Sequence, residues 1–223
     1  MGDNRMKKKL FTSVLASALV VPAVVVPVSA ETPFKDITET SPFAEAVAFL
    51  KAENIITGYG DQTFRPAENI SRQHVIYNFN KIVDLEPVRE GKTFVDVPST
   101  HPYYEAIQQA NRAGIIDGDS QNKFNPDAPI TRAQVAKILA VAFDLQADTS
   151  LAIQDVPQTH WSSEYVQALA SSGMTTVSEN GYYRPDEKLT RGQFALFLYR
   201  YLQSVEEQPM TQHIGHWGGT IDI

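Results

Sequence analysis

The 223-residue chain contains no cysteine, so it has no disulfide framework, no thiolate metal site and no thiol nucleophile. Histidine is also scarce, and none of the five histidines lies in a Ser-His-Asp context that would indicate a catalytic triad. Carboxylate pairs are common in any acidic protein and do not by themselves indicate an active site. We therefore predict that the chain is not an enzyme and that it uses no cofactor.

A segment that spans a bilayer is missing after residue 30, because no later stretch has the ~20 apolar residues that such a segment needs. Residues 1–30 begin with a basic stretch, continue with an apolar one and end in Val-Ser-Ala, the small residues that a signal peptidase reads. Pro22 and Pro27 interrupt the apolar stretch. We interpret residues 1–30 as a cleaved secretory signal peptide, with an uncleaved membrane anchor as the alternative. The mature chain is then exported and has no membrane segment.

Basic residues are too few to balance the acidic ones in the predicted mature chain. Residues 1–30 contain four basic residues and one acidic residue, so 15 Lys and Arg remain against 25 Asp and Glu, a formal charge of −10. Such a chain repels nucleic acid and anionic membranes at long range, and we expect neither as a partner. A local site can still hold an anionic partner, because charges more than ~8 Å apart are largely screened at physiological salt.

The remaining residues are organised as three copies of one pattern. The copies open with Phe-Lys-Asp-Ile, Phe-Val-Asp-Val and Ile-Gln-Asp-Val at residues 34, 94 and 153, and a Ser/Thr-Arg pair begins 37 residues after each opening. An aromatic-Xaa-Pro piece lies between the two motifs in every copy. Shared offsets without gaps indicate an internal repeat. The predicted repeats are 34–85, 94–145 and 153–203, followed by a tail at 204–223 that lacks helical periodicity.

Each repeat has two apolar stripes with helical spacing, one on either side of a loop. Phe43, Ala46, Val47 and Leu50 occupy positions i, i+3, i+4 and i+7, which places them on one face of a helix. No segment alternates convincingly with the period of two that is typical of strands, so we predict an all-α fold of three helix-loop-helix repeats. One repeat cannot bury both of its stripes, and we expect the three copies to close around one shared core. The stripes of the second helices are Val75, Phe79 and Ile82; Val135, Leu139 and Ala142; and Phe194, Leu198 and Tyr201.

An arginine lies in the first turn of the second helix in every repeat, at Arg72, Arg132 and Arg191. The Ser or Thr before it is a good N-cap, and a Gln three residues after the Thr completes a capping-box pattern in the second and third repeats. The helix dipole disfavours a cation at this end by roughly 0.3–1 kcal/mol. Three arginines at three helix starts therefore require a compensating anion.

The sequence leaves two sources of that anion open. The Asp of the opening motif, which is Asp36, Asp96 or Asp155, could pair with an arginine and lock the repeats together. Alternatively, the free N–H groups of the helix start and the guanidinium could together bind a carboxylate or phosphate of a ligand. The two interpretations are compatible, because an Asp can orient an arginine that also contacts a ligand.

The order of the motifs resembles that of the S-layer homology (SLH) repeat, in three copies over roughly residues 34–203. The shared motifs are Phe-Xaa-Asp-Val, His-Trp, Gly-Tyr-Gly-Asp, Phe-Xaa-Pro and Thr-Arg-Ala-Gln. The resemblance implies a pseudo-threefold α-helical assembly with grooves between the repeats. It also implies an exported protein of the cell wall or S-layer, attached non-covalently through a secondary cell-wall polysaccharide that often carries pyruvate ketals. Such a ketal presents the carboxylate that the arginines require.

The resemblance also implies which residues bind the glycan. Its loop glycine, expected to permit a turn with positive φ, is absent at Val177 in the third repeat. The second repeat keeps the most features of the pattern, so we expect Arg132, Asp96 and Gly118 to be the strongest candidates. The full set of predicted glycan-binding residues is Arg72, Arg132, Arg191, Asp36, Asp96, Asp155, Gly58, Gly118, Tyr103 and Trp161.

Two other functions are weighed against glycan binding. The first is a structural protein–protein module, which associates with itself in a surface lattice or docks another protein and uses every arginine internally. Buried arginines paired with Asp would favour that module, whereas open arginines beside an aromatic residue would favour glycan binding. The second is metal binding, because residues 117–128 begin like a calcium loop. Asn122 and Ala128 stand where that loop needs Gly and Glu, so we predict no metal site.

Overall fold

The computed structural model describes residues 32–148, 150–175 and 180–206. These residues form six α-helices and no strand, which confirms the predicted all-α fold of three helix-loop-helix repeats. The predicted signal peptide lies outside the described residues, as does most of the predicted tail. No helix within the described ranges combines the length and the apolar character that crossing a membrane requires. The helices are α1 (Ala44–Ala52), α2 (Arg72–Phe79), α3 (Tyr104–Arg112), α4 (Arg132–Ala142), α5 (Ser163–Ser171) and α6 (Arg191–Glu206).

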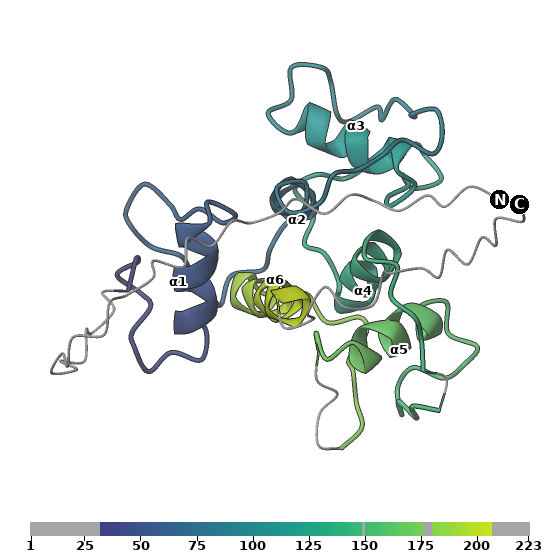
Figure 1. Cartoon of the computed structure of the whole chain (residues 1–223). Coiled ribbons are helices and arrows are strands. Elements are labelled where there is room, and N and C mark those ends of the chain that lie inside the picture. The colour runs from purple at the N-terminus through teal and green to yellow at the C-terminus, as the bar shows by residue number, and fades with distance from the viewer. Residues whose placement is uncertain (1–31, 149, 176–179, 207–223) are drawn as a thin grey trace, which may run out of the picture.

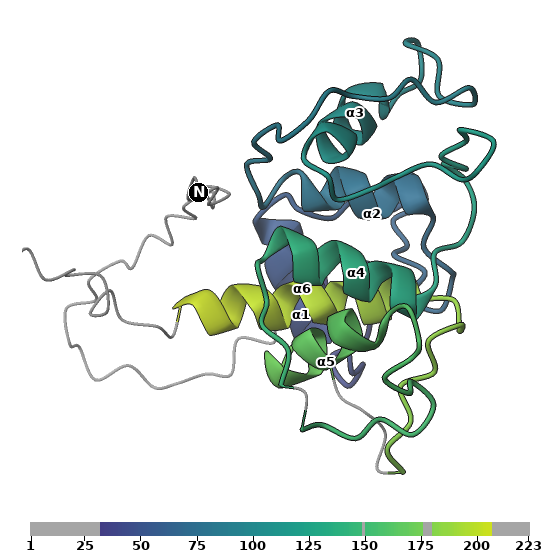
Figure 2. The ribbon, with the colours of Figure 1, turned by 90° about the vertical axis from the view of Figure 1, so that its right-hand side faces the viewer.

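The three repeats close into a ring. Figure 1 shows the second helix of each repeat, α2, α4 and α6, at the centre, with the first helices, α1, α3 and α5, outside them. Each second helix packs against the first helix of another repeat, so that α2 contacts α3, α4 contacts α5, and α6 returns to α1. Seen from the side, α3, α2, α4 and α5 follow one another from top to bottom (Figure 2). The repeats are therefore joined pairwise between neighbours, with pseudo-threefold symmetry.

A cycle of backbone hydrogen bonds closes the centre of the ring. The N–H of Ile70 donates to the carbonyl of Leu189 (2.9 Å), that of Leu189 to Ile130 (3.0 Å), and that of Ile130 to Ile70 (3.1 Å). All three side chains are buried. Because each residue comes two positions before the start of a second helix, the cycle fixes the three helix starts relative to one another.

The predicted stripes form one core that is shared by the three repeats. The stripes of the second helices are buried throughout, including Val75, Leu139 and Leu198 at the centre. From the outer helices, Val47 and Leu50 of α1 are fully buried, as is Ile107 of α3. This confirms the expectation that no repeat buries its stripes alone. The helix α6 extends three residues into the segment that the sequence predicts as tail.

The loop glycines have a packing role and not the expected conformational one. Neither Gly58 nor Gly118 has a φ in the left-handed region, so the expected positive φ is wrong for both. A Cβ at Gly118 would lie 2.8 Å from Cε1 of Phe94, and a Cβ at Gly58 would collide with the ring of Phe34. The loop therefore needs glycine so that the aromatic residue of the opening motif can pack directly against its backbone. Val177 lies outside the described residues.

Replacing Gly58 by alanine is expected to lower the free energy of unfolding by about 2–3 kcal/mol. The new Cβ would meet the Phe34 ring and would lie 2.6 Å from the backbone oxygen of Thr63, which cannot move away easily. Gly60→Ala is the matched control in the same loop, because a Cβ there has nothing within 4 Å. Urea unfolding of both variants measures the difference. Equal stabilities of the two variants would contradict the packing role.

Candidate functional site

Each helix-start arginine reaches into another repeat. Its Nε donates, at 2.8 Å, to the backbone carbonyl of the aromatic residue in that repeat's aromatic-Xaa-Pro motif. Its guanidinium carbon lies 4.5–4.7 Å from the centre of the same aromatic ring. A carbonyl dipole and a ring face therefore provide much of the compensation that the cation requires at this end of a helix. The pairs are Arg72 with Phe124, Arg132 with Tyr183, and Arg191 with Phe64.

The N–H groups at the helix starts are not free, so the expected site made of free N–H groups is wrong. In α2, the N–H of Arg72 donates to the carbonyl of Ala128 and that of Gln73 to Pro126, both at 3.0 Å. The first two N–H groups of α4 and of α6 are bonded to a neighbouring repeat in the same way. The predicted capping boxes of α4 and α6 are confirmed, and each satisfies a third N–H group. The backbone at each helix start is therefore bonded to a neighbouring repeat, and only the arginine side chains remain as candidates for binding an anion.

The aspartates of the opening motif hold the loop that receives the arginine. The two carboxylate oxygens of Asp96 accept the N–H groups of Phe124 (2.8 Å) and Asn125 (2.7 Å). Asn125 has a φ of 56°, and the two hydrogen bonds stabilise that left-handed conformation. The aspartate thereby positions the carbonyl of Phe124 that accepts Arg72 Nε. Asp36 and Asp155 make the same two hydrogen bonds in their own repeats.

The internal ion pair that the sequence left open is not observed among the described residues. No described carboxylate lies within 4.0 Å of the guanidinium nitrogens of Arg72, Arg132 or Arg191. Burial lowers the pKa of Arg72, while the more distant charges of Asp96 and Asp119 raise it. The Nη groups of Arg72 make no hydrogen bond to any described residue, so both can donate to a ligand.

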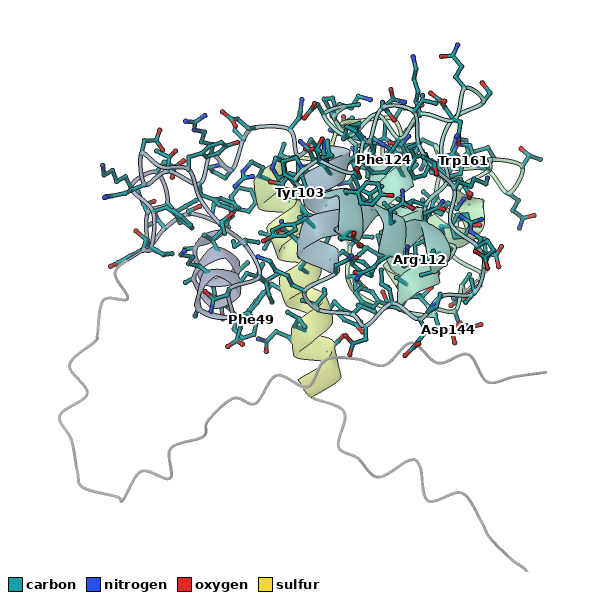
Figure 3. The ribbon with its side chains drawn as sticks, turned by 90° about the horizontal axis from the view of Figure 1, so that it is seen from above. Phe49, Tyr103, Arg112, Phe124, Asp144 and Trp161 are labelled. Carbon is teal, nitrogen blue, oxygen red and sulfur yellow. The ribbon has the colours of Figure 1, made fainter. Side chains whose placement is uncertain are left out.

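A groove of about 470 Å³ lies beside Arg72 and is lined by all three repeats. The first repeat provides Arg72, the second provides its loop with Gly118 and one face of α4, and the third provides Trp161. Trp161 is 55% exposed, which is unusual for a residue with so large an apolar side chain. Trp161 and Phe124 lie at the end of the molecule where α6 begins, whereas Phe49 lies near the other end (Figure 3).

The groove is more basic than the chain that carries it. Its described lining includes four basic side chains and two acidic ones. The predicted mature chain has a formal charge of −10, so the groove is a local exception to the charge of its surroundings. An anion that the whole surface repels at long range is attracted here at short range. The basic residues are Arg72, Lys123, Lys137 and Lys188, and the acidic ones are Asp117 and Asp119.

The structure corrects the expected grouping of site residues. Gly118 lies with Arg72 and not with Arg132, because each arginine crosses to another repeat. Asp96 is linked to Arg72 as well, through the loop at Phe124. Arg132 reaches Tyr183 instead and is not among the described residues that line this groove. The expected set of Arg132, Asp96 and Gly118 is therefore divided between two interfaces.

The surroundings of Arg191 differ from those of Arg72. Arg191 donates a second hydrogen bond, from Nη2 to the carbonyl of Thr57 (3.0 Å), and its guanidinium lies 5.0 Å from the ring centre of Tyr59. The hydroxyl of Tyr59 donates to Glu68 (2.9 Å), and Arg65 stacks on the same ring at 3.8 Å. One Nη group of Arg191 is therefore already bonded to the chain's own Thr57, and the ring of Tyr59 lies over the guanidinium.

Tyr103 packs on α2, away from the Arg72 groove. Its ring centre lies 5.3 Å from that of His74 and 5.1 Å from that of Tyr77. His74 and Tyr77 take the positions that Gln134 and Lys137 hold in α4, where those two residues line the groove. Aromatic packing thus replaces polar lining at the equivalent place in the first repeat.

Sequence reasoning missed the lysines of the groove. Lys123, Lys137 and Lys188 belong to none of the repeated motifs, and their counterparts in the other repeats are not basic. Their distribution holds a weak signal, because all three fall in the second and third repeats. That signal has no meaning until the ring brings the second and third repeats together.

Comparison with known proteins assigns the chain to a family. The S-layer homology domain matches residues 33–76, 93–136 and 153–195, and the chain therefore belongs to the S-layer homology family. This domain is a non-catalytic module.

The relatives of the chain are cell-surface proteins. A surface-layer 125 kDa protein of Lysinibacillus sphaericus is 31% identical over 96% of this chain and 18% of its own length. A cell surface protein of Thermoanaerobacter kivui is 32% identical over 93% of this chain and 26% of its own length. A cellulosome-anchoring protein of Acetivibrio thermocellus is 27% identical over 78% of this chain and 39% of its own length. The chain thus spans well under half of each relative, and the relatives confirm the expected location in the cell wall or surface layer.

Proposed function

We propose that the chain is a non-catalytic anchor that binds an anionic secondary cell-wall polysaccharide in the Arg72 groove. The observation that carries the proposal is the pair of Nη groups of Arg72, which have no described partner and lie beside an exposed Trp161 in a basic groove. One relative is named as a cellulosome-anchoring protein and another as a surface-layer protein, which supports an anchoring role at the cell surface.

The groove has the chemistry that a pyruvylated sugar requires. A guanidinium whose Nε is already fixed presents its Nη groups in one plane, where they can donate to both oxygens of a carboxylate. The indole of Trp161 offers an apolar ring face against which a sugar ring can pack. The volume of the groove lies within the ~300–1,000 Å³ that is usual for sites of small ligands. A carboxylate on a sugar uses both features at once.

The other predicted glycan-binding residues take different parts in the proposal. Asp96 is a positioning residue, since both of its oxygens are bonded to the loop that holds Arg72. Gly118 lines the groove directly. Arg132 is the candidate for an equivalent second groove, whereas Arg191 is a weaker candidate because its Nη2 is already bonded to Thr57 and Tyr59 lies over its guanidinium. The remaining predicted residues are proposed to shape the interfaces between the repeats and not to contact the ligand in the Arg72 groove. They are Gly58, Asp36, Asp155 and Tyr103.

Sedimentation with Gram-positive wall sacculi tests the proposal. The folded chain is expected to sediment with intact sacculi and to stay in solution after acid extraction has removed the secondary polymer. Binding that survives extraction would point to peptidoglycan and overturn the proposal. An absence of binding to sacculi of the source organism, together with self-association in sedimentation velocity, would favour the structural protein–protein module.

A further inference from the structure

We propose that Arg89, in the linker between the first and second repeats, positions part of the lining of the groove and shields the ligand from Asp117. This inference rests on the proposed function, because it assumes that the ligand is an anion. Arg89 lies outside the three regions that match the S-layer homology domain. The inference therefore adds a residue of the linker to a binding site that is otherwise built from the repeats.

The side chain of Arg89 is fixed by three hydrogen bonds, two of them to residues that line the groove. Its Nε donates to the carbonyl of Asn111 at 2.8 Å. Its Nη2 donates to the carbonyl of Ile116 and to Oδ1 of Asp117, both at 2.8 Å. Ile116 and Asp117 both line the groove, whereas Arg89 does not, so Arg89 holds part of the lining from outside the groove. Lys92, from the same linker, lies 3.5 Å from the same oxygen of Asp117.

The linker that carries Arg89 is itself folded onto the second repeat. The N–H groups of Val88 and Arg89 both donate to the carbonyl of Arg112, at the end of α3. Asn111, which is completely buried, accepts the N–H of Lys92 (2.7 Å) and donates to the carbonyl of Ile116 (2.9 Å). These hydrogen bonds hold the linker in place and thereby position Arg89 beside Asp117.

This arrangement occurs in the repeat whose loop forms the groove. The residues that correspond to Asn111 in the first and third repeats are Lys51 and Ala170, which cannot make the same pair of hydrogen bonds. The residue that corresponds to Asp117 in the first repeat is Thr57, which is uncharged. The acidic side chain of Asp117 therefore occurs in the same repeat as the buried Asn111 that fixes the linker carrying Arg89.

Asp117 needs such a partner because its charge is permanent at neutral pH. Partial burial raises the pKa of Asp117, but its hydrogen bond to Arg89 and the charges of Arg89, Lys92 and Lys137 outweigh burial and lower it. A bare carboxylate in the lining would repel a carboxylate on the ligand. With Arg89 and Lys92 in contact, the charge of Asp117 is offset, and the four basic side chains of the lining face only one other carboxylate, that of Asp119.

A double-mutant cycle with R89Q and D117N separates screening from simple support of the loop. The probe is a methyl glycoside that carries a pyruvate ketal, and the matched neutral probe is the same glycoside with the ketal carboxyl esterified. Calorimetry should show affinity for the acidic probe lowered about fivefold in R89Q, and nearly restored when D117N is added. R89K keeps the charge but loses the fork of hydrogen bonds, and it should bind within about twofold of the unaltered chain.

The outcomes distinguish this inference from the proposed function. If the double variant binds as weakly as R89Q, or if R89K is as weak as R89Q, then Arg89 only supports the loop and the shielding role is wrong. If the unaltered chain binds the acidic probe and R89Q binds it equally well, the inference fails while the proposed function stands. If the unaltered chain prefers the esterified probe, both fail. Circular dichroism of each variant establishes that it is folded.

Discussion

The variant Arg72→Ala is expected to bind wall sacculi at least about 30-fold more weakly than the unaltered chain. A central, desolvated arginine that meets a carboxylate is typical of residues whose truncation costs ~2 kcal/mol or more of binding free energy, which is about 30-fold. Here the truncation removes both Nη donors from the groove. It also frees the ring of Phe124, on which the guanidinium stacks at 4.7 Å. Quantitative sedimentation over a range of sacculus concentrations measures the change.

Two matched variants separate the ligand contact from other effects of Arg72→Ala. Arg132→Ala loses the same kind of carbonyl hydrogen bond and ring contact at the next interface, so its thermal stability should match that of Arg72→Ala. Arg200→Ala makes the same change in charge, about 13 Å further along α6 than Arg191, and should bind normally. If Arg72→Ala binds as well as Arg200→Ala does, the groove is not the site.

Removal of the third repeat is expected to unfold the other two. A chain that ends at residue 145 lacks Leu189, so the central cycle of hydrogen bonds is opened at Ile70 and Ile130. It also lacks α5 and α6, which cover α4 and α1 respectively. Because α1 and α4 would expose much of their buried stripes, the two remaining repeats cannot retain a core. Most of the helical circular dichroism signal should be lost.

The contrast with an open array of repeats makes this prediction decisive. In a solenoid each repeat contacts only its neighbours in sequence, and a shortened array keeps most of its structure. In the ring described here the last repeat also contacts the first, through α6 and α1. The full chain should therefore unfold in a single transition. A two-repeat chain that melts cooperatively and keeps the helical signal of α1 to α4, about three fifths of the total, would contradict the closed ring.

The helices and the core could be predicted because their signals are local. The period of the apolar residues places Val47 and Leu50, or Val135 and Leu139, on one face whatever the rest of the fold does. The three capping positions mark the starts of the second helices for the same reason. The need to bury two stripes in each repeat then required the repeats to close on each other.

The residues that make up the site were harder to predict than the helices, because they depend on which repeats contact each other in the ring. The sequence places Arg132, Asp96 and Gly118 in one repeat, but the crossing of the arginine brings Asp96 and Gly118 to Arg72 instead. An isolated helix has free N–H groups in its first turn, and the sequence therefore predicts them for α4. In the structure, carbonyl groups of the neighbouring repeat accept the first two of these N–H groups. Arg89 has no motif at all, and its contact with Asp117 depends on the path of the linker.

Nuclear magnetic resonance of the isotope-labelled chain tests the central claim most directly. The indole N–H of Trp161 and the guanidinium N–H groups of Arg72 are assigned with W161F and R72K and followed during titration with the pyruvylated methyl glycoside. The account predicts that both sets of signals shift together and saturate at one ligand concentration, while the esterified glycoside moves them little. Binding of the acidic glycoside that leaves Trp161 and Arg72 unshifted would contradict the account, because the anion would then be held elsewhere.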